Sequence, residues 1–157
     1  MNILLFLAIA FVTLWGTVYP LLTRLTNDET ITVARPFYDQ VNGPLMLALV
    51  FLMGVGPLIP WRKAGMASVR KTLLPPIIGG LATVGILAAL GLHKEYALIG
   101  FGLATFVTTG ILMEWFRGTR SRHRSSGENY ATAFLRLIMA NRPRYGGYIV
   151  HLSVVMV

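Results

Sequence analysis

The stretch LLPPIIGGLATVGILAALGLHKEYALIGFGLATFVTTGILMEWF, residues 73–116, decides the fold. It holds two apolar runs, 73–92 and 96–116, and each has roughly the 20 residues that a helix needs to cross a bilayer. Both runs are continuous, whereas the strands of a membrane barrel alternate apolar and polar residues. Because unpaired backbone groups are costly in hydrocarbon, the stretch predicts two transmembrane helices joined by a tight turn at HKE.

Similar apolar runs precede this pair. Residues 3–22 and 44–61 are each long enough to span, which makes four full spans. A fifth run begins at Tyr145, is still apolar at Val157 and predicts an incomplete span at 146–157, so we expect the chain to stop inside a helix. The expected fold is all-α, a polytopic transmembrane bundle of four full spans and a truncated fifth, with residues 1–157 as a single transmembrane domain.

The composition agrees with lipid as the solvent. The chain has 157 residues, of which 55% are hydrophobic and only 13% charged, values that exclude an ordinary soluble domain. The net charge of +8 does not indicate nucleic acid, because the basic residues lie between apolar runs and not on a folded basic surface. The absence of cysteine excludes disulfides and thiolate metal sites in this chain.

Basic residues gather in two of the connections. Loops rich in Lys and Arg stay on the cytoplasmic side of a membrane protein, and connections 62–71 and 117–144 are such loops, whereas 23–43 and 93–95 hold few basic residues. We therefore expect a multi-pass protein of the plasma (inner) membrane, with the N-terminus and the basic loops in the cytoplasm. The residues concerned are Arg62, Lys63, Arg70, Lys71, Arg117, Arg120, Arg122, Arg124, Arg136, Arg142 and Arg144.

One part of the long inside loop has the period of an amphipathic helix. Residues 125–141 repeat apolar side chains at helical spacing, and Ser125 with Glu128 forms a possible capping box. Such a helix is expected along the inner membrane surface, with the preceding arginines near anionic headgroups. A solvated basic loop that needs no partner is the alternative.

Small residues and prolines predict how the spans pack. Gly100, Ala104 and Thr108 recur every four residues on one helix face, which favours close helix–helix contact. Prolines indicate kinked or interrupted helix ends, because proline removes a backbone donor. These prolines are Pro57, Pro60, Pro75 and Pro76.

The three histidines differ in setting. His93 and His123 lie in polar connections and are expected to be structural, whereas His151 lies about six residues past the inside boundary, about 9 Å along the helix at ~1.5 Å per residue. An ionisable side chain inside a membrane is a functional candidate. Three roles remain open for His151: a ligand of haem iron or another metal, an interhelical hydrogen bond, or a proton relay.

No catalytic residue is predicted, because no nucleophile–base pair or cluster of metal ligands occurs at a usable spacing. Glu114 is the other charged residue at the edge of a span, three residues before Arg117. We expect Glu114 to extend from the helix end toward water and to pair with Arg117.

Two stretches carry a family resemblance: ITVARPFYDQVNGPLMLALVFLMGVGPLIPWRK, residues 31–63, and NRPRYGGYIVHLSVV, residues 141–155. Together they resemble CcmF, the membrane component of the cytochrome c maturation system that is thought to act as haem lyase. The resemblance implies a structural haem b held by two intramembrane histidines, one of them in the segment that matches YGGYIVHL. It therefore implies His151 as an axial ligand of haem b and of its iron.

The resemblance also implies a role in covalent haem attachment to apocytochrome c, with haem transport and haem lyase activity as associated functions. The family's Trp-rich motif, its outward histidines and its other intramembrane ligand have no counterpart here. We therefore expect a later-span portion of a CcmF-like protein, and whether this chain alone is an enzyme stays open.

The expected partners are membrane lipid, apocytochrome c, and other maturation subunits or the remaining portion of a split CcmF-like protein, with no nucleic acid. The alternative function is a non-catalytic structural subunit of a respiratory or photosynthetic membrane complex. A transporter fragment is a third reading, because helices broken by proline and glycine can line a substrate path.

Overall fold

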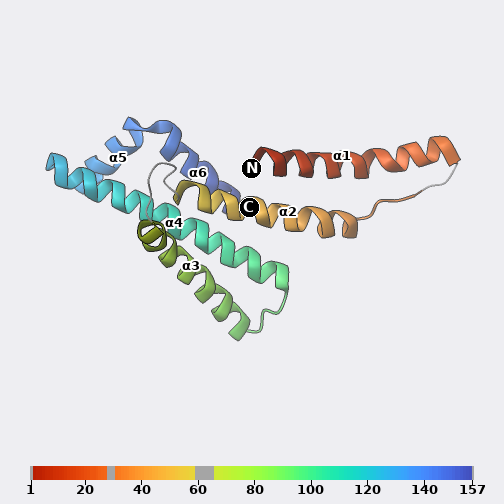
Figure 1. The fold of residues 1–157 in the computed structure, drawn as a ribbon, viewed down its shortest axis with the longest axis horizontal. Coiled ribbons are helices and arrows are strands. Elements are labelled where there is room, and N and C mark those ends of the chain that lie inside the picture. Colours follow the sequence, from red (N-terminus) through yellow and green to blue (C-terminus); the bar gives the residue numbers. More distant parts are fainter. Residues whose placement is uncertain (1, 28–30, 59–65, 157) are drawn as a thin grey trace. The chain divides into compact units, whose positions relative to one another are not determined.

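The computed structural model describes residues 2–27, 31–58 and 66–156, and most of these are helical (Figure 1). Within this described part there is no strand, so the predicted all-α fold is confirmed. Pro60, Trp61, Arg62 and Lys63, which the sequence places at the end of the second span, lie outside the described residues. The elements are α1 (Asn2–Asn27), α2 (Arg35–Val55), η1 (Gly56–Leu58), α3 (Met66–Ala89), α4 (Glu95–Ser126), α5 (Tyr130–Ala140) and α6 (Arg142–Met156).

Four helices are long and apolar enough to cross a membrane, as the four full spans require. They cover Asn2–Thr26, Arg35–Val55, Val69–Ala89 and Glu95–Ser126. The region of the predicted fifth span is also helical, as α6, but its crossing of the membrane remains a prediction. The chain divides into two compact units, Met1–Leu52 and Met53–Val157, and each is described by itself. The single transmembrane domain likewise remains a prediction.

In the first unit, α1 meets α2 at a close contact and a hydrogen bond. A Cβ atom added to Gly16 would lie 2.6 Å from the Tyr38 hydroxyl oxygen, so glycine lets that ring approach. One turn away on each helix, the Asn42 side-chain amide donates to Thr13 Oγ1 at 3.3 Å. Small residues and interhelical hydrogen bonds associate helices in lipid, where the hydrophobic effect no longer distinguishes one apolar face from another.

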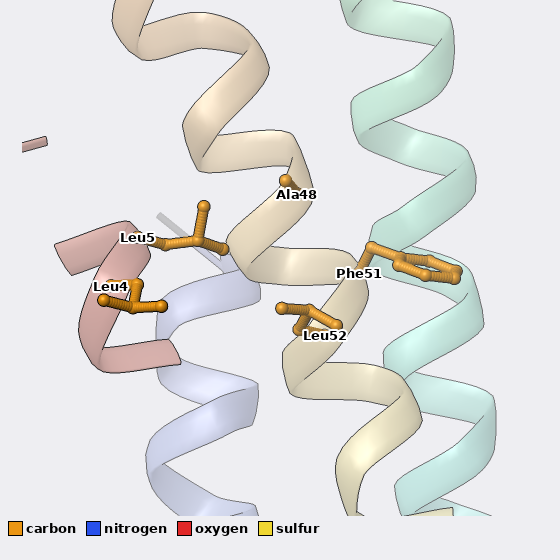
Figure 2. Close-up of a pocket in the computed structure, with 5 residues that line it drawn as sticks. All are labelled: Leu4, Leu5, Ala48, Phe51 and Leu52. Atoms are coloured by element: carbon orange, nitrogen blue, oxygen red, sulfur yellow. The ribbon is translucent and has the colours of Figure 1, made fainter. Parts of the chain in front are cut away.

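An open apolar pocket of about 400 Å³ also lies in this unit (Figure 2). Leu4 and Leu5 line it from α1, and Ala48, Phe51 and Leu52 line it from α2. These side chains carry no polar group, so the pocket offers no chemistry.

The second span begins earlier than the sequence predicted. The run 44–61 marked the apolar part, but α2 already starts at Arg35. Pro36 explains this start, because proline is favoured in the first helical turn, where no backbone donor is needed. Arg35 and Asp39 form an exposed i,i+4 ion pair at 3.5 Å, and Pro44 lies inside the helix.

The tight turn between 73–92 and 96–116 is confirmed. Helix α3 ends at Ala89, and Gly91 adopts a positive φ of 92° that favours glycine. Gly91 N–H donates to the Ala88 carbonyl and Leu92 N–H donates to the Leu87 carbonyl. These are the two hydrogen bonds of a Schellman cap. His93, Lys94 and the turn therefore connect α3 directly to an antiparallel α4.

The interface between α3 and α4 corrects the predicted contact row. A Cβ added to Gly100 would meet nothing within 4 Å, whereas one added to Gly80 would lie 2.8 Å from the Gly102 carbonyl oxygen. The buried row on α4 contains Gly102, Phe106 and Gly110, which has the predicted spacing of four but does not include Gly100. Small residues occur on several faces of α4, and the one that packs depends on where α3 lies.

Two further predictions about helix ends are corrected. Pro75 and Pro76 lie inside α3 and end no helix, although η1 does interrupt the chain at Pro57. In transmembrane helices proline is tolerated in the interior because neighbouring groups satisfy the freed carbonyls.

Helix α4 does not end at Phe116 but continues through 32 residues to Ser126. Most of residues 117–144 are therefore helical, because a single interior glycine, Gly118, is tolerated and no proline interrupts the helix before Gly127 closes it with a φ of 68°. The predicted capping box is wrong: Ser125 lies in the last turn of α4 and donates to the Arg122 carbonyl at 3.0 Å. Asn129 precedes α5 instead, without a side-chain cap.

The amphipathic helix is confirmed as α5, shorter than the predicted 125–141. Its Phe134 ring meets Trp115 of α4 edge to face, with centroids 5.7 Å apart. A Cβ added to Gly118 would lie 2.8 Å from Leu137 and 2.9 Å from the Tyr145 hydroxyl oxygen. Gly118 therefore lets both α5 and α6 pack against α4.

Candidate functional site

His151 lies in the third turn of α6 and is half-buried. Its neighbour on the helix surface is Tyr148, which is buried, because residues three and four apart are neighbours on a helix; Tyr145, three residues further back, is buried as well. Its Nδ1 is buried and makes no hydrogen bond within the described residues. The Gly147 carbonyl, one turn earlier, interacts with the ring electrostatically, but not in hydrogen-bond geometry.

Two other buried polar atoms of the second unit lack a partner among the described residues, Trp115 Nε1 and Thr119 Oγ1. An indole nitrogen is a donor only and a neutral hydroxyl is a poor ligand, so neither suits a transition metal. Imidazole does suit one, since one ring nitrogen can bind a metal while the other donates a hydrogen bond. Among these three side chains, His151 alone has ligand chemistry.

The helix surface beside His151 is open. A Cβ added to Gly146 or to Gly147 would meet nothing within 4 Å. Helical side chains lean toward the N-terminus, so the imidazole of His151 covers the turn that contains Gly147. With no side chain at Gly147, a large planar group could approach the histidine along the helix.

A polar network includes Arg144 and Tyr148, seven and three residues before His151. Arg144 Nε–H donates to the Tyr148 hydroxyl at 2.9 Å, and Arg144 Nη2 donates to Glu114 Oε2 at 2.7 Å. Glu114 also lies 3.8 Å from Arg117, which donates to Thr72 Oγ1 at 3.1 Å. We call these residues of α3, α4 and α6 the Glu114 network.

The Glu114 network determines how α6 is rotated against α4. Glu114 is mostly buried, with a side-chain exposure of 18%, while its partner Arg144 is half-exposed. The hydrogen bond to Tyr148 is the main cause that raises the pKa of Arg144. Since Tyr148 lies one turn before His151, the network helps to orient the face that carries the histidine.

The predicted pairing of Glu114 with Arg117 is found, but Glu114 lies within α4 and not at a helix end. The shorter bond to Arg144 was missed, because 30 residues separate the two and no spacing rule connects them. Arg142 and Arg144, on either side of Pro143, predicted only which side of the membrane this segment faces.

The other two histidines lie at a link and at a helix end, and one of them was misplaced. His93 is exposed in the link between α3 and α4, as predicted. His123 lies in the last turn of α4 and not in a loop, where its ring stacks on Tyr130 with centroids 4.1 Å apart. Its Nδ1 also lies against the Glu128 carbonyl, so His123 closes the α4–α5 junction.

No group of three or more His, Asp or Glu side chains that could hold a metal ion occurs within residues 2–27, 31–58 and 66–156. Any metal bound at His151 would therefore need ligands besides this chain's described carboxylates and histidines, as an iron held in a macrocycle has.

Four apolar helices of spanning length place the chain in the class of multi-pass α-helical membrane proteins. It is similar to the cytochrome c-type biogenesis protein ccl1 of Rhodobacter capsulatus, with 30% identity over 77% of this chain and 19% of the relative. The cytochrome c-type biogenesis protein CycK of Bradyrhizobium diazoefficiens is 32% identical over 72% of this chain and 17% of that protein. CcmF of Haemophilus influenzae is 27% identical over 99% of this chain and 23% of that protein.

The chain belongs to this family of cytochrome c-type biogenesis proteins and corresponds to a portion of it. It spans about a fifth of the length of the curated relatives that it matches. No family model and no solved structure matches it.

Proposed function

We propose that this chain is the part of a cytochrome c biogenesis protein that supplies one axial ligand, His151, to a haem b. In this role it takes part in covalent haem attachment to apocytochrome c, together with a partner or a further portion of the protein. The observation that carries the proposal is the buried, unpartnered ring nitrogen of His151 on an apolar helix with an open surface beside it.

The residues around His151 fit such a group. Haem-ligating histidines commonly donate the second ring N–H to a carbonyl, and the Gly147 carbonyl lies near enough to the ring to take that role. That arrangement would leave Nε2 for the iron. Gly146 and Gly147 would leave the macrocycle room against α6.

A bound haem would supply an iron that changes between two oxidation states, which is the chemistry an electron relay needs. The chain itself would contribute the ligand, the rotation of α6 set by the Glu114 network, and a largely apolar face. The second ligand and the site of the substrate haem would come from outside this chain.

The relatives named for cytochrome c-type biogenesis support the rest of the proposal. Partners would be other maturation subunits or the remaining portion of a split protein, apocytochrome c and membrane lipid. The location would be the inner membrane, with the N-terminus and the basic segments in the cytoplasm, where lysines and arginines accumulate.

The test is a visible absorption spectrum of the chain purified with its partner subunits. We expect the spectrum of a b-type, six-coordinate haem, and we expect His151→Ala to remove it without lowering the yield of the assembly. His123→Ala and His93→Ala are the matched controls and should keep the haem, because both residues lie at turns or helix ends.

A haem that survives His151→Ala would contradict the axial ligand. An assembly that contains the wild-type chain but no haem would favour the alternative, a structural transmembrane subunit of a larger complex.

A further inference from the structure

The final turns of α4 carry three arginines on one side. Arg117, Arg120, Ser121 and Arg124 recur at i, i+3, i+4 and i+7, and together they line a shallow pocket of about 360 Å³. We call these four residues the arginine face. It is separate from His151, which lies on α6, and it shares only Arg117 with the Glu114 network.

The length of α4 places the arginine face at the membrane surface. A helix of 32 residues is about 48 Å long at ~1.5 Å per residue, whereas the hydrocarbon core is about 30 Å thick. The apolar part of α4 ends at Phe116, so the excess length projects into the headgroup layer and beyond it. The arginine face covers the first 10 Å or so of this projection, at ~1.5 Å per residue.

One row of exposed side chains crosses this boundary. Leu112 and Phe116 are 52% and 62% exposed, and Arg120 and Arg124, which continue the same i+4 row, are exposed as well. The row is therefore apolar along the hydrocarbon and cationic at the headgroups. A phospholipid matches this row, because its apolar acyl chains lie in the hydrocarbon and its anionic phosphate lies at the headgroup level.

The charges of the arginine face are not balanced by the protein. Arg117 has Glu114 at 3.8 Å, but Arg120 and Arg124 have no carboxylate within salt-bridge distance among the residues with described positions. Like charges at i,i+3 and i,i+4 repel each other on a helix. The helix dipole compensates Arg124 in the last turn, but its effect does not reach Arg117. An anion between the guanidinium groups would remove this repulsion.

We propose that the arginine face binds the phosphate of an anionic phospholipid. Guanidinium groups bind phosphate oxygens through paired, charge-assisted hydrogen bonds, and Ser121 adds a hydroxyl donor. The phosphate belongs to a lipid and not to a free ion, because the apolar half of the row, Leu112 and Phe116, provides a surface for the acyl chain.

The experiment titrates the full chain in neutral detergent with palmitoyl-oleoyl-phosphatidylglycerol and counts bound lipid by native mass spectrometry. Each surface arginine contributes about fivefold to attraction for anionic lipid. We therefore expect Arg120→Gln to lower the affinity for the first bound phosphatidylglycerol by about fivefold. The double variant, Arg120→Gln with Arg124→Gln, should lower it by about 25-fold. Both side chains are exposed, so the helical circular dichroism should not change.

The matched control removes two exposed charges elsewhere, Arg70→Gln with Arg142→Gln, and should change the affinity less than twofold. An equal loss in this control would overturn the proposal, because any cationic surface would then suffice. Palmitoyl-oleoyl-phosphatidylcholine and inorganic phosphate are the comparison probes. If phosphatidylcholine bound the wild-type chain as tightly as phosphatidylglycerol, the face would not select a negatively charged lipid, and the proposal would be overturned. If inorganic phosphate bound as tightly, the acyl chain would contribute nothing, and the proposal would also be overturned.

Discussion

The two units of this chain join their helices in different ways. In the first unit, α1 and α2 meet through the Asn42–Thr13 hydrogen bond and the approach of Tyr38 to Gly16. In the second, α3 and α4 touch backbone to backbone at glycine, and the Glu114 network joins α3, α4 and α6. Since apolar faces are interchangeable in lipid, small residues and polar contacts decide which helices pair. The more strongly connected unit is also the one that carries His151.

The largest effect should come from the Glu114 network. Glu114→Gln removes the carboxylate that faces Arg144 and Arg117, and we expect the free energy of unfolding in detergent to fall by about 2 kcal/mol. A fully buried pair would lose more, about 3–5 kcal/mol, but both arginines here are partly exposed and screened by solvent.

The matched control for this substitution is Asp39→Asn in the first unit, which removes an ion pair that is open to solvent. Its cost should be under about 0.5 kcal/mol. Equal costs for Glu114→Gln and Asp39→Asn would mean that the network does not distinguish the two units.

A smaller effect is expected at the glycine contact between α3 and α4. Gly80→Ala puts a methyl group 2.8 Å from the Gly102 carbonyl oxygen, and backbone cannot move aside cheaply, so we expect a loss of about 1–2 kcal/mol. Gly85→Ala in the same helix meets nothing within 4 Å and should stabilise by up to about 1 kcal/mol, because alanine favours a helix. Thermal unfolding of both variants measures the difference in their stability. An equal loss of stability in Gly85→Ala would contradict the close approach of α3 and α4 at Gly80 as the cause.

The smallest effect should follow loss of an interhelical hydroxyl bond. Thr83 Oγ1 lies 3.1 Å from Thr105 Oγ1 of α4 and also 3.1 Å from the Gly79 carbonyl oxygen of its own helix, so one of the two hydroxyls donates across the interface. Thr83→Val should cost about 0.6 kcal/mol, the mean for hydrogen bonds between transmembrane helices. Thr17→Val in α1 is the control, because that hydroxyl donates to Thr13 of its own helix. Chemical denaturation in mixed micelles compares the two, and a larger loss in Thr17→Val would contradict the assignment.

Much of the fold could be predicted because span length and apolar runs are local properties of the sequence. The HKE turn, the four spanning helices and the amphipathic α5 all follow from hydropathy and period. What failed depends on three-dimensional neighbours. The face of α4 that packs against α3 runs through Gly102 and Thr105, and small residues at Gly100, Ala104 and Thr108 gave a competing pattern of equal quality.

The candidate site was predictable to a lesser extent. His151 stands out in the sequence because it is an ionisable residue within an apolar run, and its buried nitrogen agrees with that choice without testing a ligand. The bond from Arg144 to Glu114 was beyond prediction, since it joins two helices that only the fold brings together. His123 was placed in a loop because its neighbours are charged, although arginine is a good helix former and α4 simply continues.

The account's central claim is that His151 binds the iron of a haem b, and chemical rescue tests it most directly. The visible spectrum of His151→Gly, purified with its partner subunits, is recorded before and after addition of imidazole. We predict that the b-type bands are absent before addition and return with imidazole, because the small ring can replace the missing ligand. Bands that persist without imidazole would contradict the claim.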